Sequence, residues 1–215
     1  MDKYTETFKT WNSIAKQYEE KFMDLDLYNS SYDYFCNALP KGSSHILELG
    51  CGPGNITKYV LNKRPDFNLL GIDVAPKMVE LAQANNPTAR FETMDVRDIH
   101  HLKDTFQGIL CGFCLPYLSE KDAVKLIANC HNLLNDNGIL YLSFVAGNPK
   151  NSHYQEGSDG QRVYFHYHSQ EEIEKQLRIK HFEEMKVFEV DYKRSTSELE
   201  THTILCARKK PKPEI

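Results

Sequence analysis

The stretch that decides the fold is Ile46-Leu47-Glu48-Leu49-Gly50-Cys51-Gly52-Pro53-Gly54. An apolar run of strand length enters a turn with three alternating glycines, and a helical pattern begins near Asn55. Glycines leave backbone N–H groups open to a ligand, because no Cβ atom stands in the way. The N-terminus of the following helix favours negative groups at the same place. The stretch therefore predicts a strand–turn–helix unit that holds a ligand at its turn, with a purely structural tight turn as the alternative.

The sequence around this stretch alternates short apolar runs with amphipathic ones. The runs predict strands over 45–49, 68–73, 89–94, 108–113 and 139–145, and helices over 56–63, 75–85, 120–134 and 170–178. Two later β-like runs, 185–192 and 201–207, predict an antiparallel hairpin. Strand–helix alternation indicates an α/β fold with a doubly wound, seven-stranded, mostly parallel sheet. An antiparallel C-terminal hairpin strand is expected at or near its edge.

Composition excludes several classes of protein. The 215 residues are 40% hydrophobic and 26% charged, the balance of a globular chain with one domain. A net charge of −4 argues against a broad basic surface for nucleic acid. Apolar stretches such as 139–144 are far shorter than the ~20 residues of a membrane helix. Because the N-terminus lacks a signal-like apolar region and six cysteines are too few for a disulfide scaffold, we expect a reducing, cytoplasmic compartment.

Two classes of ligand use a glycine turn of this kind. Dinucleotide sites have Gly-x-Gly-x-x-Gly/Ala, and the sixth position counted from Gly50 is Asn55, which does not fit. The pattern is instead acidic-x-Gly-x-Gly-x-Gly, with Glu48 as the acid. It resembles motif I of the Rossmann-like, class I S-adenosylmethionine-dependent methyltransferases. The resemblance assigns this turn to cofactor binding through Glu48, Gly50, Cys51, Gly52 and Gly54.

Later positions resemble the same family in the same order. The run 69–73 ends in Asp73, whose carboxylate would accept hydrogen bonds from both ribose hydroxyls. This acid alone does not separate NAD from S-adenosylmethionine, since both carry that ribose. The resemblance implies that Val74 and Met78 flank the adenine. It further implies that Asp95 accepts the adenine amino group and that the Val96 N–H meets a ring nitrogen, whereas a helix N-cap is the alternative for Asp95.

The segment 106–118 also resembles the family, and it implies both cofactor and acceptor contacts. The end of this strand would line the methionine part of the cofactor, with Cys111 and Phe113. Tyr117 follows on the acceptor side and is a candidate catalytic residue. The segment 11–18 resembles a helix that lids the cofactor in many small-molecule methyltransferases. Tyr18 at its end would bind the methionine carboxylate, or would pack on the core.

These assignments divide one methyltransferase domain, residues 1–210, into functional parts. Residues 1–40 are expected to form a helical lid and 41–146 the cofactor-binding core. Residues 147–170 are expected to begin as a loop, continue as a short strand, and form a substrate-side insertion. A helix and hairpin occupy 171–210, and a basic tail follows at 211–215.

The segment 162–169 offers candidate bases. Strand alternation would place Tyr164, His166 and His168 on one face, as a base or as orienting groups, with a solvated strand face as the alternative. The two histidines lack a clear third ligand, and the single Cys111-x-x-Cys114 lacks a second pair. No metal site is therefore expected.

The resemblance implies methyl transfer from S-adenosylmethionine to a small molecule, which leaves S-adenosylhomocysteine as product. Two alternatives are a protein methyltransferase and a catalytically silent regulatory protein that binds S-adenosylmethionine. An NAD-linked oxidoreductase is disfavoured by Asn55. The expected partners are a small-molecule acceptor and at most a second copy of the chain (monomer or homodimer), with no nucleic acid and no membrane.

Overall fold

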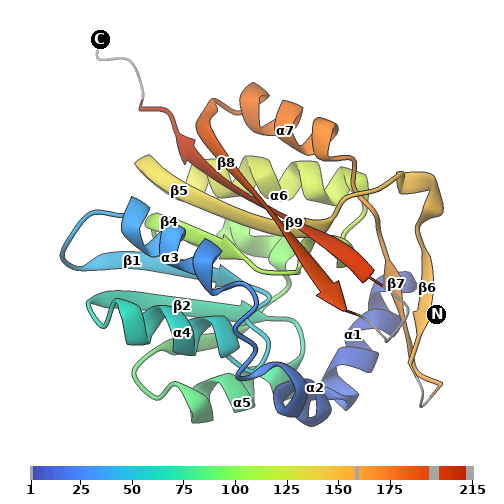
Figure 1. Cartoon of the computed structure of the whole chain (residues 1–215). Coiled ribbons are helices and arrows are strands. Elements are labelled where there is room, and N and C mark those ends of the chain that lie inside the picture. Colours follow the sequence, from blue (N-terminus) through green and yellow to red (C-terminus); the bar gives the residue numbers. More distant parts are fainter. Residues whose placement is uncertain (1, 158–159, 194–198, 212–215) are drawn as a thin grey trace.

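A seven-stranded sheet forms the centre of the computed structural model, which describes residues 2–157, 160–193 and 199–211 (Figure 1). Its spatial order is β3-β2-β1-β4-β5-β9-β8. The strands are β1 (Ser44–Leu49), β2 (Phe67–Asp73), β3 (Arg90–Thr93), β4 (Phe106–Cys111), β5 (Leu134–Val145), β8 (Phe182–Lys193) and β9 (Leu199–Lys209). The first five are parallel, and β9 is antiparallel to both of its neighbours. The predicted fold class is confirmed, and the antiparallel strand lies next to the edge.

Helices cover both faces of this sheet (Figure 1). One face carries α3 (Asn29–Ala38), α4 (Asn55–Lys63) and α5 (Pro76–Asn85), and the other carries η1 (Val96–His101), α6 (Glu120–Leu133) and α7 (Gln170–Ile179). In α6 the apolar positions follow the helical period and are buried: Ala123, Leu126, Ile127, Cys130 and Leu133. Central strands are apolar on both sides because parallel strands are covered twice. In β1, Leu47 packs toward α6, whereas Ile46 packs toward α3.

Two segments differ from the sequence expectation. The expected turn at 135–138 lies inside β5 as a bulge, because Leu134 pairs with Phe106 and Ile139 already pairs with Gly108. The segment 147–170 contains η3 (Pro149–Asn151) and a two-stranded hairpin of β6 (His153–Glu156) and β7 (Arg162–Phe165).

The expected strand over 162–169 is wrong beyond Phe165, where β7 ends. The His166 N–H donates to the carbonyl of Pro116 (2.7 Å) rather than to a strand partner. The predicted grouping persists beyond the end of β7, because the Tyr164 and His166 ring centroids lie 4.7 Å apart and those of His166 and His168 lie 6.4 Å apart. Residues 194–198, in the connection of the predicted hairpin, lie outside the described residues. The same holds for residues 212–215, which are most of the predicted tail.

The N-terminal helices α1 (Lys3–Ser13) and α2 (Ala15–Phe22) lie across the carboxyl ends of the parallel strands (Figure 1). The Tyr4 hydroxyl on α1 donates to Asp122 at the start of α6, and the Thr10 hydroxyl donates to the carbonyl of Arg162 (2.8 Å). These contacts hold α1 against α6 and β7. The adjacent strands β1 and β4 connect in opposite directions, and ligands bind in open α/β sheets at the carboxyl end of such a switch point. In the described part of the chain, no helix has the length and apolarity to span a membrane.

Candidate functional site

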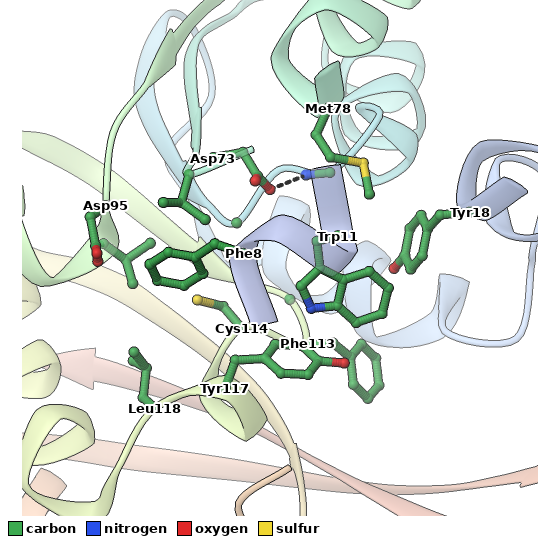
Figure 2. A pocket seen from close by; sticks show the side chains of 15 residues that line it. Phe8, Trp11, Tyr18, Asp73, Met78, Asp95, Phe113, Cys114, Tyr117 and Leu118 are labelled. Atoms are coloured by element: carbon green, nitrogen blue, oxygen red, sulfur yellow. Dashed lines mark hydrogen bonds between the residues drawn. The ribbon is translucent and has the colours of Figure 1, made fainter. Parts of the chain in front are cut away.

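An open cavity, with about 720 Å³ of empty space that includes adjoining solvent, lies at this switch point. Turns that follow β1, β2, β3 and β4 form one wall, and α1 and α2 close the other (Figure 2). It is lined by Phe8, Trp11, Tyr18, Gly50, Gly52, Asp73, Val74, Met78, Asp95, Val96, Gly112, Phe113, Cys114, Tyr117 and Leu118. Most of the residues expected to bind cofactor thus meet at one place.

The three glycines of the first turn have different surroundings. All have positive φ (66°, 53° and 82° for Gly50, Gly52 and Gly54), which favours glycine. A Cβ atom on Gly52 would meet only ordinary contacts, with Tyr18 at 3.6 Å, so its turn is open toward the cavity. A Cβ atom on Gly54 would lie 2.3 Å from the amide nitrogen of Asn86. Gly50 and Gly52 therefore line the cavity, whereas Gly54 permits close packing behind it.

Asp73 fixes the shape of the turn and faces the cavity. Its carboxylate accepts the Gly52 N–H and the Ala75 N–H, each at 2.9 Å (Figure 2 shows the first). Burial raises the pKa of Asp73, and backbone hydrogen bonds oppose this rise. A carboxylate has about four acceptor positions, so these two bonds leave capacity for ligand hydroxyl groups.

Asp95 has the N-cap role that was the alternative for it, and it also lines the cavity. It is the N-cap of η1 and accepts the Arg97 N–H (2.9 Å), and its carboxylate is paired with the Arg97 guanidinium. The same residue lines the cavity opposite Met78, and Figure 2 shows the two on opposite sides of the opening. The carboxylates of Asp73 and Asp95 and the apolar side chains of Val74 and Met78 line the same cavity, and such a set suits a flat heterocycle that carries donor groups.

Glu48 does not line the cavity. Its side chain is fully buried beneath the turn and accepts a hydrogen bond from the Thr57 hydroxyl. Burial raises its pKa to about 8, although the Thr57 bond opposes the rise. Its other oxygen has no hydrogen-bond partner among the described residues. The structure therefore places this acid one layer behind Gly50 and Gly52.

Two other predicted residues are also outside the cavity wall. The Cys51 and Cys111 side chains are buried in the core on opposite faces of the sheet. The adjacent Cys114, not Cys111, reaches the cavity. All three are free thiols.

Aromatic residues of the N-terminal helices close the cavity (Figure 2). The Trp11 ring packs edge-on against Tyr18 and Tyr117, with centroids 5.5 and 5.2 Å apart. The indole N–H of Trp11 is buried and has no partner in the described part of the chain. Burial raises the pKa of Tyr18, which stays a neutral hydroxyl over the turn. Tyr18 therefore lines the cavity and at the same time packs against Trp11 and Phe22.

A second chamber of about 1080 Å³ continues from the cavity past Trp11, Phe113 and Tyr117. Its walls are rich in aromatic side chains, and they include residues of α2, the α2–α3 connection, the end of β4, the β6–β7 hairpin and the β8–β9 pair. Polar groups at its surface include Lys21, Tyr28, Glu200 and His202. Phe113, with φ of 54°, stands at the junction, where its N–H donates to the Ser143 hydroxyl (2.7 Å).

The three candidate bases of the segment 162–169 line neither space. The Tyr164 hydroxyl donates to the carbonyl of Ser152 (3.1 Å), and its ring lies beneath Lys3. His168 is buried, with Nε2 2.9 Å from the carbonyl oxygen of Leu115. His166 borders a separate small cavity near the start of α1. Of the four candidate catalytic residues, Tyr117 alone lines the cavity and the chamber.

Sequence reasoning missed Phe8 and Leu118 in the cavity. It also missed the polar residues of the chamber, Lys21, Tyr28, Glu200 and His202. Phe8 lies one helical turn before Trp11, so the 3.6-residue period predicts that they share a face. His202 had a weaker signal, a single histidine in an apolar strand. Its position in the chamber depends on pairing with Val145 of β5, 57 positions earlier in the chain.

Known proteins resemble this chain in sequence and in fold. Residues 46–138 match a family described as "Methyltransferase domain". The trans-aconitate 2-methyltransferase of Enterobacter sp. (strain 638) is 35% identical over 99 residues, which are 45% of this chain and 37% of that protein. The chain spans less than half the length of the curated relatives it matches.

Solved structures share the fold at low sequence identity. Magnesium protoporphyrin IX methyltransferase from Synechocystis PCC 6803, with bound S-adenosylmethionine, has a TM-score of 0.74 at 17% identity over 98% of both chains. A Burkholderia thailandensis 1,6-didemethyltoxoflavin-N1-methyltransferase has a TM-score of 0.70 at 20% identity, over 96% of this chain and 88% of its own. The family model thus matches the segment that carries the predicted motifs, and the solved methyltransferases share the fold of the whole chain.

Proposed function

We propose that this class I methyltransferase domain transfers the methyl group of S-adenosylmethionine to a small-molecule acceptor. The observation that carries the proposal is the pairing of two connected spaces. One is a cavity with a glycine turn and two carboxylates, and the other is an aromatic chamber that meets it at Phe113 and Tyr117. A methyl donor and a separate acceptor need such an arrangement, since transfer depends mainly on their alignment.

The residues present fit the donor. Asp73 would accept the ribose hydroxyls, while Val74 and Met78 would hold the adenine ring. Asp95 and the Val96 N–H would bind the adenine edge, and Gly50, Gly52 and Tyr18 the methionine part. When bound, S-adenosylmethionine supplies an activated sulfonium methyl group. Residues 1–40 and 147–170 would act as lid and acceptor wall of one domain, as either a monomer or a homodimer in the cytoplasm.

Calorimetric titration tests the cofactor directly. S-adenosylmethionine and S-adenosylhomocysteine should bind the full chain more tightly than NAD. Tighter binding of NAD, or no binding of either sulfur nucleoside, contradicts the proposal.

Turnover separates the remaining alternatives. Incubation with a cell extract should yield S-adenosylhomocysteine and methyl label in the small-molecule fraction. Label in macromolecules instead supports a protein methyltransferase. If the chain binds S-adenosylmethionine but forms no S-adenosylhomocysteine with any extract, a regulatory binding protein is supported.

A further inference from the structure

Three polar side chains in the wall of the aromatic chamber form a continuous hydrogen-bonded series. The Tyr28 hydroxyl lies 2.7 Å from Nδ1 of His202, and Nε2 of His202 lies 2.8 Å from Oε1 of Glu200. Tyr28 and His202 are both 6% exposed, and all three residues line the chamber. The proposed binding of cofactor uses none of them.

Aromatic rings hold the imidazole in this position. Tyr28 and Tyr192 stack on His202 with interplanar angles of 15° and 18°, and Phe113 packs against it at 4.8 Å between centroids. Tyr28 precedes α3, Tyr192 belongs to β8 and His202 to β9. Three distant segments of the chain thus converge on one imidazole, beside the residue that separates the chamber from the cofactor cavity.

The partners fix which nitrogen carries the proton. A carboxylate only accepts hydrogen bonds, so Nε2 of His202 donates to Glu200. Nδ1 is then the acceptor, and the Tyr28 hydroxyl donates to it. Burial raises the pKa of Tyr28, so its hydroxyl is protonated near neutral pH. The oxygen of Tyr28 keeps lone pairs that can accept a proton from a molecule in the chamber.

We propose that Tyr28, His202 and Glu200 form a proton relay that deprotonates the acceptor during methyl transfer. The inference rests on the proposed function. As the acceptor oxygen forms its bond to the methyl carbon, the S–CH₃ bond breaks and its electron pair remains on sulfur. The acceptor proton passes to the Tyr28 oxygen, and the Tyr28 proton passes to Nδ1 of His202. The imidazolium that results is paired with Glu200 and later releases its proton to water.

The chamber favours a phenolic acceptor. Its walls include Trp11, Tyr18, Phe113, Tyr117 and Phe165, which suit a flat aromatic ring. The charged and titratable groups that face His202 or share its chamber are Tyr18, Lys21, Tyr28, Tyr32, Tyr117, Tyr192 and Glu200. Lys21 is exposed, and Glu200 is the carboxylate in contact with the imidazole. A phenol loses its proton only near pH 10, so its oxygen needs a base at neutral pH.

Two phenols separate a relay from a packing role. At a pH of about 8.5, phenol is protonated, whereas 4-nitrophenol is already ionised. His202→Gln should lower kcat for phenol by about 100-fold, the usual contribution of a general base, with little change in KM. It should lower kcat for 4-nitrophenol by less than about threefold. Tyr28→Phe, which keeps the ring, should show the same contrast, and His166→Gln is the matched histidine control.

A spectroscopic measurement tests the relay without turnover. In the complex with S-adenosylhomocysteine, the ¹⁵N shifts of His202 should report a protonated Nε2 and an unprotonated, hydrogen-bonded Nδ1. Tyr28→Phe should remove the hydrogen bond at Nδ1 and leave the affinity for S-adenosylhomocysteine unchanged. A protonated Nδ1 and a bare Nε2 in the wild-type complex would overturn the proposal.

The outcomes distinguish this inference from the function on which it rests. Equal losses with both phenols assign Tyr28 and His202 to packing and overturn the relay. A wild-type chain that binds S-adenosylhomocysteine but methylates neither phenol also overturns it, while the proposed function stands. Failure to bind S-adenosylhomocysteine overturns the proposed function itself. If His202→Gln does not fold, the Tyr28→Phe result decides between relay and packing.

Discussion

The cofactor cavity and the acceptor chamber share a boundary but are built differently. Apart from α1, α2 and the segment after β4, the cavity takes its lining from residues 50–96, at turns that directly follow β1, β2 and β3. The chamber joins residues from α2, the β6–β7 hairpin and the β8–β9 pair, which only the tertiary fold brings together. Local backbone geometry therefore defines where the donor would bind, whereas long-range pairing defines the surroundings of the acceptor.

The largest effect is expected at Asp73, where the turn and the ligand share one carboxylate. Asp73→Ala should weaken S-adenosylhomocysteine binding by at least about 100-fold in calorimetry, because it removes charge-assisted bonds worth ~1.5–3 kcal/mol each. It also removes the acceptor of the Gly52 N–H. Asp95→Ala should cost about tenfold, since the carboxylate of Asp95 is already paired with Arg97. An equal loss at both positions would contradict the distinction between them.

A smaller effect is expected from Glu48, one layer behind the turn. Its folded-state pKa of about 8 is above the ordinary value of 4.5. The group therefore contributes stability that is fully present below pH ~4.5 and is lost as pH rises through ~8. Between pH 6 and 7 it should lower the free energy of unfolding by about 1.4 kcal/mol. Glu48→Gln should remove this decline in urea titrations.

An exposed glutamate provides the control for this slope. Glu20 lies on the outer face of α2, so Glu20→Gln should leave the wild-type slope unchanged. A wild-type slope that persists in Glu48→Gln would mean that Glu48 is ionised in the folded chain at neutral pH. The side chain of Glu48 would then be in contact with the polar cavity rather than buried in the layer behind it.

The sequence predicted the fold, and most of the residues that it assigned to cofactor binding line one cavity, because both depend on local signals. The run 46–54 contains most of β1 and the whole turn within nine positions, and α4 begins at the next residue. Asp73 is the last residue of β2. Local sequence does not determine whether a side chain faces the cavity or the packed core. Glu48 and Cys111 lie in or beside the motifs, but both side chains are buried in the core. Strand propensity alone did not show that the chain after Phe165 leaves its hairpin to bond with Pro116.

The acceptor side was less predictable for the same physical reason. His166 lies in an aromatic segment with a second histidine two positions later, whereas His202 stands alone between two threonines, so the sequence pattern pointed to His166 rather than to His202. The antiparallel register of β9 between β5 and β8 carries His202 into the chamber, next to Tyr28. Register is set by the whole sheet and a shift of one residue would reverse its faces.

The smallest effect is therefore expected at His166, and it sharpens the comparison between the two histidines. Burial, followed by the charges of His168 and Lys3, lowers the pKa of His166 to about 4, so the imidazole is neutral at working pH. Its contribution to stability is present above pH ~6.5 and is lost as pH falls through ~4. His166→Gln should reduce this acid-side loss in unfolding titrations and change kcat for phenol by less than twofold. If His166→Gln instead abolished the decline of kcat at acid pH, the base would lie in the segment 162–169. The roles of His166 and His202 would then be exchanged.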